Sequence, residues 1–187
     1  MLYADCNAIA PRTAEEVSRT ILNAGARFAD AGIIGPPPTR PGNRIFTSGP
    51  GARELEGLRD FGLDIRVIDG EVGQASGLKM CYAATTKGLQ ALGAEILVAA
   101  KLLGVEDTLR AEQELGGDLA AVRHFVERAL PGMPPKAYRW IGEMEEIARC
   151  FEDLGMPGRL MLGAADVYTN FRDGGVLAQE LQLSRAN

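Results

Sequence analysis

Residues 73–104, GQASGLKMCYAATTKGLQALGAEILVAAKLLG, decide the fold class of this chain. Their apolar positions recur with the spacing of one long helix that is apolar on much of its circumference, so we expect it to be buried among other helices. These positions are Leu78, Tyr82, Leu89, Leu92, Ile96, Val98 and Leu102. The composition changes just before this stretch, after Asp69, which separates a mixed first part of the chain from a helical second part.

Everything after the long helix is expected to be helical. The further helices are predicted at about 106–115, 118–129, 135–154 and 157–173. The most apolar stretch, Leu89 to Val105, contains Glu95 and Lys101, which make it too short and too charged to span a bilayer. We therefore expect no membrane segment.

The first part of the chain has the pattern of a strand, a helix and a second strand. Leu2 to Ala4 is a short β-prone run, and residues 26–30 form another. Between them Pro11 opens a helix, because proline suits the first helical position, and Gly25 ends it. This β-α-β order implies parallel pairing and an α/β domain.

A stiff loop follows, because residues 35–41 read GPPPTRP and cannot lie inside a strand. The next elements expected are strands at 44–48 and 64–68 and a short helix at 51–60. The predicted fold is therefore an α/β remnant of a Rossmann-like domain over residues 1–70, followed by an all-α helical domain over residues 71–187.

Composition and charge exclude several classes of protein. The chain has 187 residues, 46% hydrophobic and 24% charged, and its net charge of -5 arises without a basic stripe, so nucleic acid is not expected as a partner. Three widely spaced cysteines, Cys6, Cys81 and Cys150, predict reduced thiols and a cytoplasmic protein. Asp5 follows Met1 too closely for a signal peptide, and one histidine, His124, argues against a zinc site.

Residues 49–54, GPGARE, imitate a dinucleotide-binding turn because they lie between a predicted strand and a predicted helix. The third glycine of that motif is Glu54 here, and its carboxylate would repel a pyrophosphate. We therefore expect an ordinary turn in which Glu54 faces the positive end of the helix.

Residues 73–79, GQASGLK, are more informative about chemistry. Their two glycines would let a ligand approach the backbone where the long helix begins. The helix also places Lys79, Tyr82, Ala83 and Thr86 on one face. Lys79 is therefore a candidate proton donor and acceptor, and a solvated surface lysine is the alternative that the spacing leaves open.

Other reactive residue types have weaker support. Ser48 and Ser76 have no histidine partner in the sequence around them, which argues against a Ser-His-Asp hydrolase. His124 is expected at the surface or half-buried, and Trp140 is expected to anchor the packing of helices.

Four segments, in order, resemble the β-hydroxyacid dehydrogenases, which include 3-hydroxyisobutyrate and 6-phosphogluconate dehydrogenases. The segments are DCNAIAP at 5–11, GARFADA at 25–31, GQASGLKMC at 73–81 and RWIGEM at 139–144. The last one is similar to bacterial relatives with a phosphogluconate dehydrogenase-like, NAD-binding C-terminal domain. Together the segments are distributed along most of the chain, from residue 5 to residue 144.

The resemblance implies an oxidoreductase that uses NAD or NADP and transfers hydride between nicotinamide and a small hydroxy acid. It makes Lys79 the general acid/base and Asn7 a ligand of nicotinamide or substrate. It also makes Gly35 part of the loop that holds the substrate carboxylate. Ser76 and Gly77, at the start of the long helix, are expected to contact substrate or nicotinamide.

Several positions depart from the family pattern. The family's Ser-Gly-Gly loop stands here as residues 34–36, Ile-Gly-Pro, which loses a hydroxyl and one N–H donor. The asparagine four residues after the lysine is Ala83, the glutamate of the 6-phosphogluconate enzyme falls at Thr86, and a second lysine is replaced near Glu143. These changes argue against an ordinary 6-phosphogluconate dehydrogenase. Tyr82 is placed to share the proton relay that they leave vacant.

The largest departure concerns the family's N-terminal β-α-β unit with its Gly-x-Gly-x-x-Gly turn, which the sequence does not contain. We therefore expect a truncated form that by itself binds NAD(P) weakly or not at all. The alternative is a non-catalytic fragment that acts as a helical oligomerisation domain, which the widely apolar long helix favours. The resemblance also implies a homodimer packed through this domain.

Overall fold

The computed structural model describes residues 1–36 and 40–183, and it divides into two compact units. The first unit comprises residues 1–83 and 149–154, and the second comprises residues 84–148 and the chain from Gly155 onward. The units divide the long helix after Ala83. A domain boundary between residues 70 and 71 stays a prediction.

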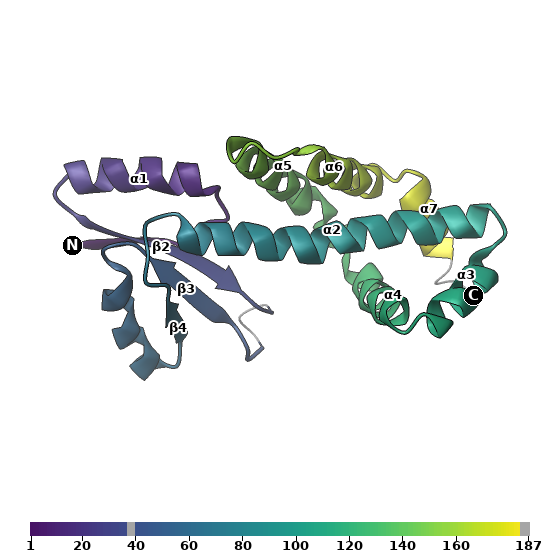
Figure 1. Cartoon of the computed structure of the whole chain (residues 1–187), viewed down its shortest axis with the longest axis horizontal. Helices are drawn as coiled ribbons and strands as arrows, with labels where there is room; N and C mark the ends of the chain where they lie inside the picture. The colour runs from purple at the N-terminus through teal and green to yellow at the C-terminus, as the bar shows by residue number, and fades with distance from the viewer. Residues whose placement is uncertain (37–39, 184–187) are drawn as a thin grey trace. The chain divides into compact units, whose positions relative to one another are not determined.

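A four-stranded sheet with flanking helices forms the first unit (Figure 1). Its elements are β1 (Leu2–Asp5), α1 (Pro11–Asn23), β2 (Arg27–Ile34), β3 (Arg44–Ser48), the 3-10 helix η1 (Ala52–Phe61), β4 (Asp64–Val67) and the first turns of α2 (Gln74–Leu102). The strand order is β1-β2-β3-β4, with β1 at one edge. Figure 1 shows α1 and η1 on opposite sides of this sheet.

The predicted β-α-β unit is confirmed, because β1 and β2 are parallel and Pro11 begins α1. β2 is longer than predicted, and this extension changes the sheet. From Asp30 to Ile34 it pairs antiparallel with β3, from Ser48 back to Arg44. The antiparallel ladder supplies hydrogen bonds to β2 beyond the end of β1, so β2 continues to Ile34. Residues 37–39 of the predicted loop lie outside the described residues.

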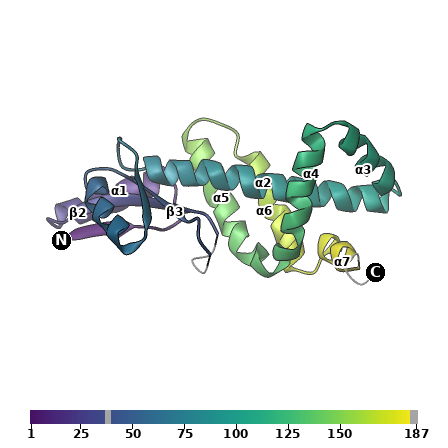
Figure 2. The same ribbon diagram turned by 90° about the horizontal axis from the view of Figure 1, so that it is seen from below.

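The second unit is helical throughout, as predicted. It contains the rest of α2, then α3 (Glu106–Leu115), α4 (Asp118–Ala129), the short 3-10 turns η2 (Leu130–Gly132) and η3 (Pro134–Lys136), α5 (Ala137–Asp153) up to Ala148, α6 (Arg159–Arg172) and α7 (Val176–Leu183). Helix α7 was not predicted. Figure 2 shows these helices grouped around the second half of α2. Within the described residues, no helix is long and apolar enough to cross a membrane.

The burial of α2 differs from the prediction. Its buried side consists largely of alanines together with Met80, Leu97 and Val98. Five of the large apolar residues that were expected to be buried are exposed instead: Leu78, Tyr82, Leu92, Ile96 and Leu102. Small residues allow neighbouring helices to approach closely, and at Gly93 a Cβ atom would overlap the side chain of Val126 in α4. The larger apolar side of α2 therefore faces outward.

Candidate functional site

A buried carboxylate from the sheet holds the beginning of α2. Asp30 of β2 accepts hydrogen bonds from the backbone N–H of Gly73 at 3.0 Å, the N–H of Ser76 at 3.0 Å and the Ser76 hydroxyl at 2.6 Å. The Ser48 hydroxyl donates to Asp30 at 3.1 Å and accepts from the N–H of Ala75 at 3.0 Å. Together these bonds satisfy backbone donors that the first turn of a helix leaves without partners.

A close approach between β2 and α2 determines where Lys79 lies. A Cβ atom at Gly32 would lie 2.7 Å from the carbonyl oxygen of Ala75 and 3.2 Å from Cβ of Lys79, so only glycine permits this packing. The Lys79 ammonium donates a hydrogen bond to the carbonyl oxygen of Ile33. The amine is thereby held at the carboxyl end of β2. Tyr82, one turn further along α2, is 45% exposed.

Asn7 and Gly35 follow the carboxyl ends of the parallel strands β1 and β2, where ligands bind in open α/β sheets. The Asn7 side-chain amide and backbone N–H both donate to Asp5, each at 2.8 Å. Gly35 has a φ of 146°, and a Cβ atom there would lie 2.7 Å from the carbonyl oxygen of Gly42. The structure thus brings Lys79 close to the loop of Gly35 and keeps Asn7 at the end of the adjacent strand.

Ser76 and Gly77 already have structural roles at the start of α2. Ser76 is buried, and both its N–H and its hydroxyl are bound to Asp30. The N–H of Gly77 donates to the carbonyl oxygen of Gly73 at 2.7 Å, and its Cα faces Pro11. A ligand that accepted a hydrogen bond from the Ser76 hydroxyl would have to replace Asp30 as the acceptor.

The turn that imitates a dinucleotide motif is part of the sheet's packing. The N–H of Gly51 donates to the carbonyl oxygen of Phe28 at 2.8 Å, and a Cβ atom at Gly51 would lie 2.6 Å from the same oxygen. Glu54 lies in the first turn of η1, as expected, and it also forms an ion pair with Arg27 at 2.7 Å. The turn leads into a 3-10 helix, and its N–H at Gly51 is not available to a phosphate.

A second polar cluster lies in the helical unit and was not predicted as a group. Lys87 of α2 forms an ion pair with Glu143 of α5 at 2.5 Å, and its ammonium lies 5.7 Å from the ring centre of Trp140. The Tyr168 hydroxyl donates to the Lys87 carbonyl at 2.7 Å, and its ring meets Trp140 edge-on at 5.1 Å. Burial, and secondarily the charge of Glu143, raise the pKa of Tyr168 above its usual value. Trp140 therefore anchors helix packing, as predicted.

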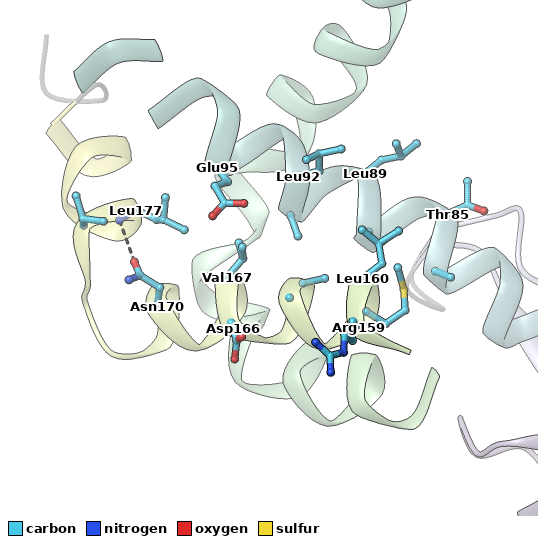
Figure 3. Close-up of a pocket in the computed structure, with 17 residues that line it drawn as sticks. Thr85, Leu89, Leu92, Glu95, Arg159, Leu160, Asp166, Val167, Asn170 and Leu177 are labelled. Carbon is cyan, nitrogen blue, oxygen red and sulfur yellow. Dashed lines mark hydrogen bonds between the residues drawn. The ribbon is translucent and has the colours of Figure 1, made fainter. Parts of the chain in front are cut away.

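The helical unit also contains a largely apolar groove of about 730 Å³ (Figure 3). Leu89 and Leu92 of α2 form one wall, and Leu160 and Val167 of α6 form the other. The side chain of Asn170 accepts a hydrogen bond from the N–H of Leu177 at 2.9 Å and thereby ties α7 to α6 at one end. All of the residues that line the groove belong to the second unit, so it does not include Lys79 or the sheet.

The remaining reactive side chains form no further centre. Cys6 and Cys81 are exposed and Cys150 is buried, and none of the three is in a disulfide. The pKa of Cys6 is raised chiefly by burial and also by the charges of Asp5 and Asp30. His124 is at the surface, as predicted, 4.0 Å from Glu114. Groups of His, Cys, Asp and Glu that could hold a metal ion do not occur in the described part of the chain.

The fold is that of the 3-hydroxyisobutyrate dehydrogenase-like proteins, so the fold that the resemblance implies is confirmed. A 3-hydroxyisobutyrate dehydrogenase of Mycobacterium tuberculosis, solved with L-serine, superimposes with a TM-score of 0.69 at 18% identity, over 98% of this chain and 70% of that one. Residues 100–171 match the family model described as a domain of unknown function, DUF1932. Most of these residues lie in the second, helical unit.

Two relatives are more similar in sequence. The conserved protein MTH1747, of unknown function and described as structurally similar to 3-hydroxyacid dehydrogenases, is 28% identical, with a TM-score of 0.73 over 96% of this chain and 67% of that one. An uncharacterized 28.5 kDa protein of Methanothermus fervidus is 35% identical over 108 residues, which are 58% of this chain and 41% of that protein. This chain therefore matches less than half the length of that curated relative.

Proposed function

We propose that this chain is part of an NAD(P)-dependent oxidoreductase that transfers hydride between nicotinamide and a small hydroxy acid. The observation that carries the proposal is the placement of Lys79. Its amine is held on the Ile33 carbonyl, at the carboxyl end of β2 and next to the loop of Gly35. Three cysteines outside disulfides are consistent with the proposal of a protein of the reducing cytoplasm.

In this proposal Lys79 takes the proton from the substrate hydroxyl as the carbinol carbon is oxidised, and returns it in the reverse direction. Tyr82 passes that proton onward from the next turn of α2. The backbone N–H of Gly35 and the side chain of Asn7 orient the reacting groups. Ser76 and Gly77 stay predicted contacts at the start of the helix.

The nicotinamide cofactor, when bound, supplies the hydride acceptor or donor. In the proposal, the nicotinamide ring would lie near Asn7, Gly35 and Lys79. The turn at Gly51 does not provide a binding site for the pyrophosphate of the cofactor, because the N–H of Gly51 donates to the carbonyl oxygen of Phe28. In the proposal, this chain therefore supplies the proton-transfer group and the substrate contacts, and it does not supply the main cofactor contacts.

The test is hydride transfer measured from nicotinamide absorbance, with this chain joined to a nucleotide-binding domain of its superfamily and a panel of small hydroxy acids. Lys79→Met should lower turnover by at least about 100-fold, the usual contribution of an acid/base residue. Lys136→Met, at an exposed position of η3, is the matched control and should leave turnover unchanged. Wild-type turnover by Lys79→Met would remove the proposed role.

A second candidate function is a homodimer built on the exposed side of α2. Positions 85, 89, 92, 96 and 99 alternate in steps of four and three, which is the repeat of helices that pair along a seam. Leu92 is 50% and Ile96 is 40% exposed, and the groove of Figure 3 lies beside them. A second copy of this chain would cover this stripe, because a two-fold pair buries the same patch from both subunits.

Light scattering of the purified chain at micromolar concentration tests this candidate. The wild-type chain should have the mass of a dimer, and Leu92→Lys together with Ile96→Lys should give a monomer. Leu115→Lys is the matched control, because Leu115 is 84% exposed on α3 and lies outside the stripe. A folded wild-type monomer would count against the dimer.

A further inference from the structure

Arg44 lies directly opposite the loop that the proposed site uses. In the antiparallel ladder between β2 and β3, Arg44 pairs with Ile34, and the next pair on the same face is Gly32 with Phe46. Gly32 faces α2, because its missing Cβ makes room for Ala75 and Lys79. Side chains of directly opposed residues point to one side of a sheet, so Arg44 emerges on the face that carries Lys79.

The guanidinium of Arg44 forms no hydrogen bond or ion pair with the described residues, although, after the hydrogen bond from Arg66, its charge helps to lower the pKa of Asp64. Its Nε atom is buried without a hydrogen bond, and none of the ion pairs of the described residues includes it. Asp64, its neighbour in β4, is already bound by the two forked nitrogens of Arg66, at 3.1 and 2.9 Å. A half-buried arginine is costly without an anion, so this arrangement points to a ligand.

The position of the Lys79 ammonium is a second observation that points to an anion at this place. The Lys79 ammonium contacts the carbonyl oxygen of Ile33, and Arg44 stands across from Ile34, so two positive groups flank one peptide segment. The residues that follow, Gly35 and Pro36, offer one backbone N–H between them. An anion at this place would therefore depend on side-chain donors.

We propose that Arg44 binds the carboxylate of the substrate and so restricts this site to small carboxylic acids. The inference rests on the proposed function and adds a specificity-determining residue to it. The planar fork of arginine matches the two oxygens of a carboxylate, which a lysine cannot reproduce. Arg44 thereby supplies donors that the Ile34–Pro36 loop lacks, while Lys79 keeps its proposed role as the acid/base of the hydroxyl group.

The experiment follows the Nε–Hε signal of Arg44 by NMR in the whole chain, assigned from its loss in Arg44→Lys, during titration with 3-hydroxybutyrate. We expect a saturable shift that the neutral methyl ester does not produce. Arg44→Gln should bind the acid at least about tenfold more weakly, as expected for the loss of charged hydrogen bonds. Arg19→Gln, at an exposed position of α1, changes the net charge equally and should bind as the wild type does.

Three results would overturn the inference. They are an unchanged affinity in Arg44→Gln, no saturable shift of Arg44 in the wild type, and an equal response to inorganic phosphate, which would point to a phosphate group as the ligand. The backbone amide spectrum of Arg44→Gln verifies its fold, and Arg44→Lys should retain only part of the affinity. Failure of the Lys79→Met test would remove the proposed acid/base without altering this titration, so the two outcomes are distinguishable.

Discussion

The carboxylate of Asp30 and the hydroxyl of Ser76 are 2.6 Å apart, although 46 residues separate them in the sequence. Both residues are buried, and the contact joins the middle of the sheet to the first turn of α2. Lys79 lies one turn beyond Ser76. The contact between Asp30 and Ser76 therefore holds the helix that presents the proposed acid/base.

We expect Asp30→Asn to lower the free energy of unfolding by about 2–3 kcal/mol, because asparagine replaces one accepting oxygen by an NH2 group. That NH2 group cannot accept the hydrogen bonds that the carboxylate of Asp30 now accepts. Ser76→Ala removes one donor and should cost about 1–2 kcal/mol. Urea unfolding measures both. Asp69→Asn is the control, since Asp69 pairs with Arg53 at the surface, and it should cause no measurable change. Equal effects of the three changes would contradict this account.

Gly32→Ala should destabilise the chain by about 1–3 kcal/mol, because the added methyl group would lie 2.7 Å from the Ala75 carbonyl and force α2 away from β2. Gly142→Ala provides the contrast, since a Cβ atom there meets nothing within 4 Å and alanine favours the helix. Thermal unfolding should show a lower midpoint for the first variant and an unchanged or higher one for the second. A neutral Gly32→Ala would mean that the close packing is not required.

Tyr168 should make the helical unit sensitive to alkaline pH. Its pKa is raised in the folded chain, so its contribution to stability is complete below the usual pKa of about 10 and is lost as the pH rises above that value. Tyr168→Phe should flatten the decline in the free energy of unfolding above pH 10, and should also cost about 1 kcal/mol at neutral pH through the lost bond to Lys87. Tyr138→Phe, at a residue that is 62% exposed, should leave the alkaline decline intact.

The chain by itself should bind NADH and NADPH weakly or not at all, because the few contacts at Asn7, Gly35 and Lys79 would not offset the entropy lost on association. Isothermal titration measures this. Glu54→Gly completes a Gly-x-Gly-x-x-Gly pattern and should still not bind, since the N–H of Gly51 stays bonded to Phe28. A dissociation constant in the low micromolar range for either cofactor would contradict the prediction.

Local patterns explain why much of the candidate site could be predicted. Lys79 was selected because glycines precede it at a helix start, whereas Asn7 and Gly35 were selected only through the resemblance to the dehydrogenases. Arg44 was missed, since its importance depends on which residue lies opposite it and on Asp64 being bound elsewhere. The position of Lys87 beside Glu143 and Tyr168 was also missed, because three separate helices bring them together.

The sequence by itself determined the order of the elements up to α6, the parallel β-α-β unit and the helical second half, because these follow from periodicity, helix ends and turn residues along neighbouring positions. Only the tertiary structure decided the antiparallel pairing of β2 with β3, the attachment of α2 to Asp30 and the outward direction of Leu92 and Ile96. Each of these depends on residues distant in the chain. A hydrophobic pattern says which side chains can be buried, but packing among small residues such as Gly93 decides which side of a helix its neighbours cover.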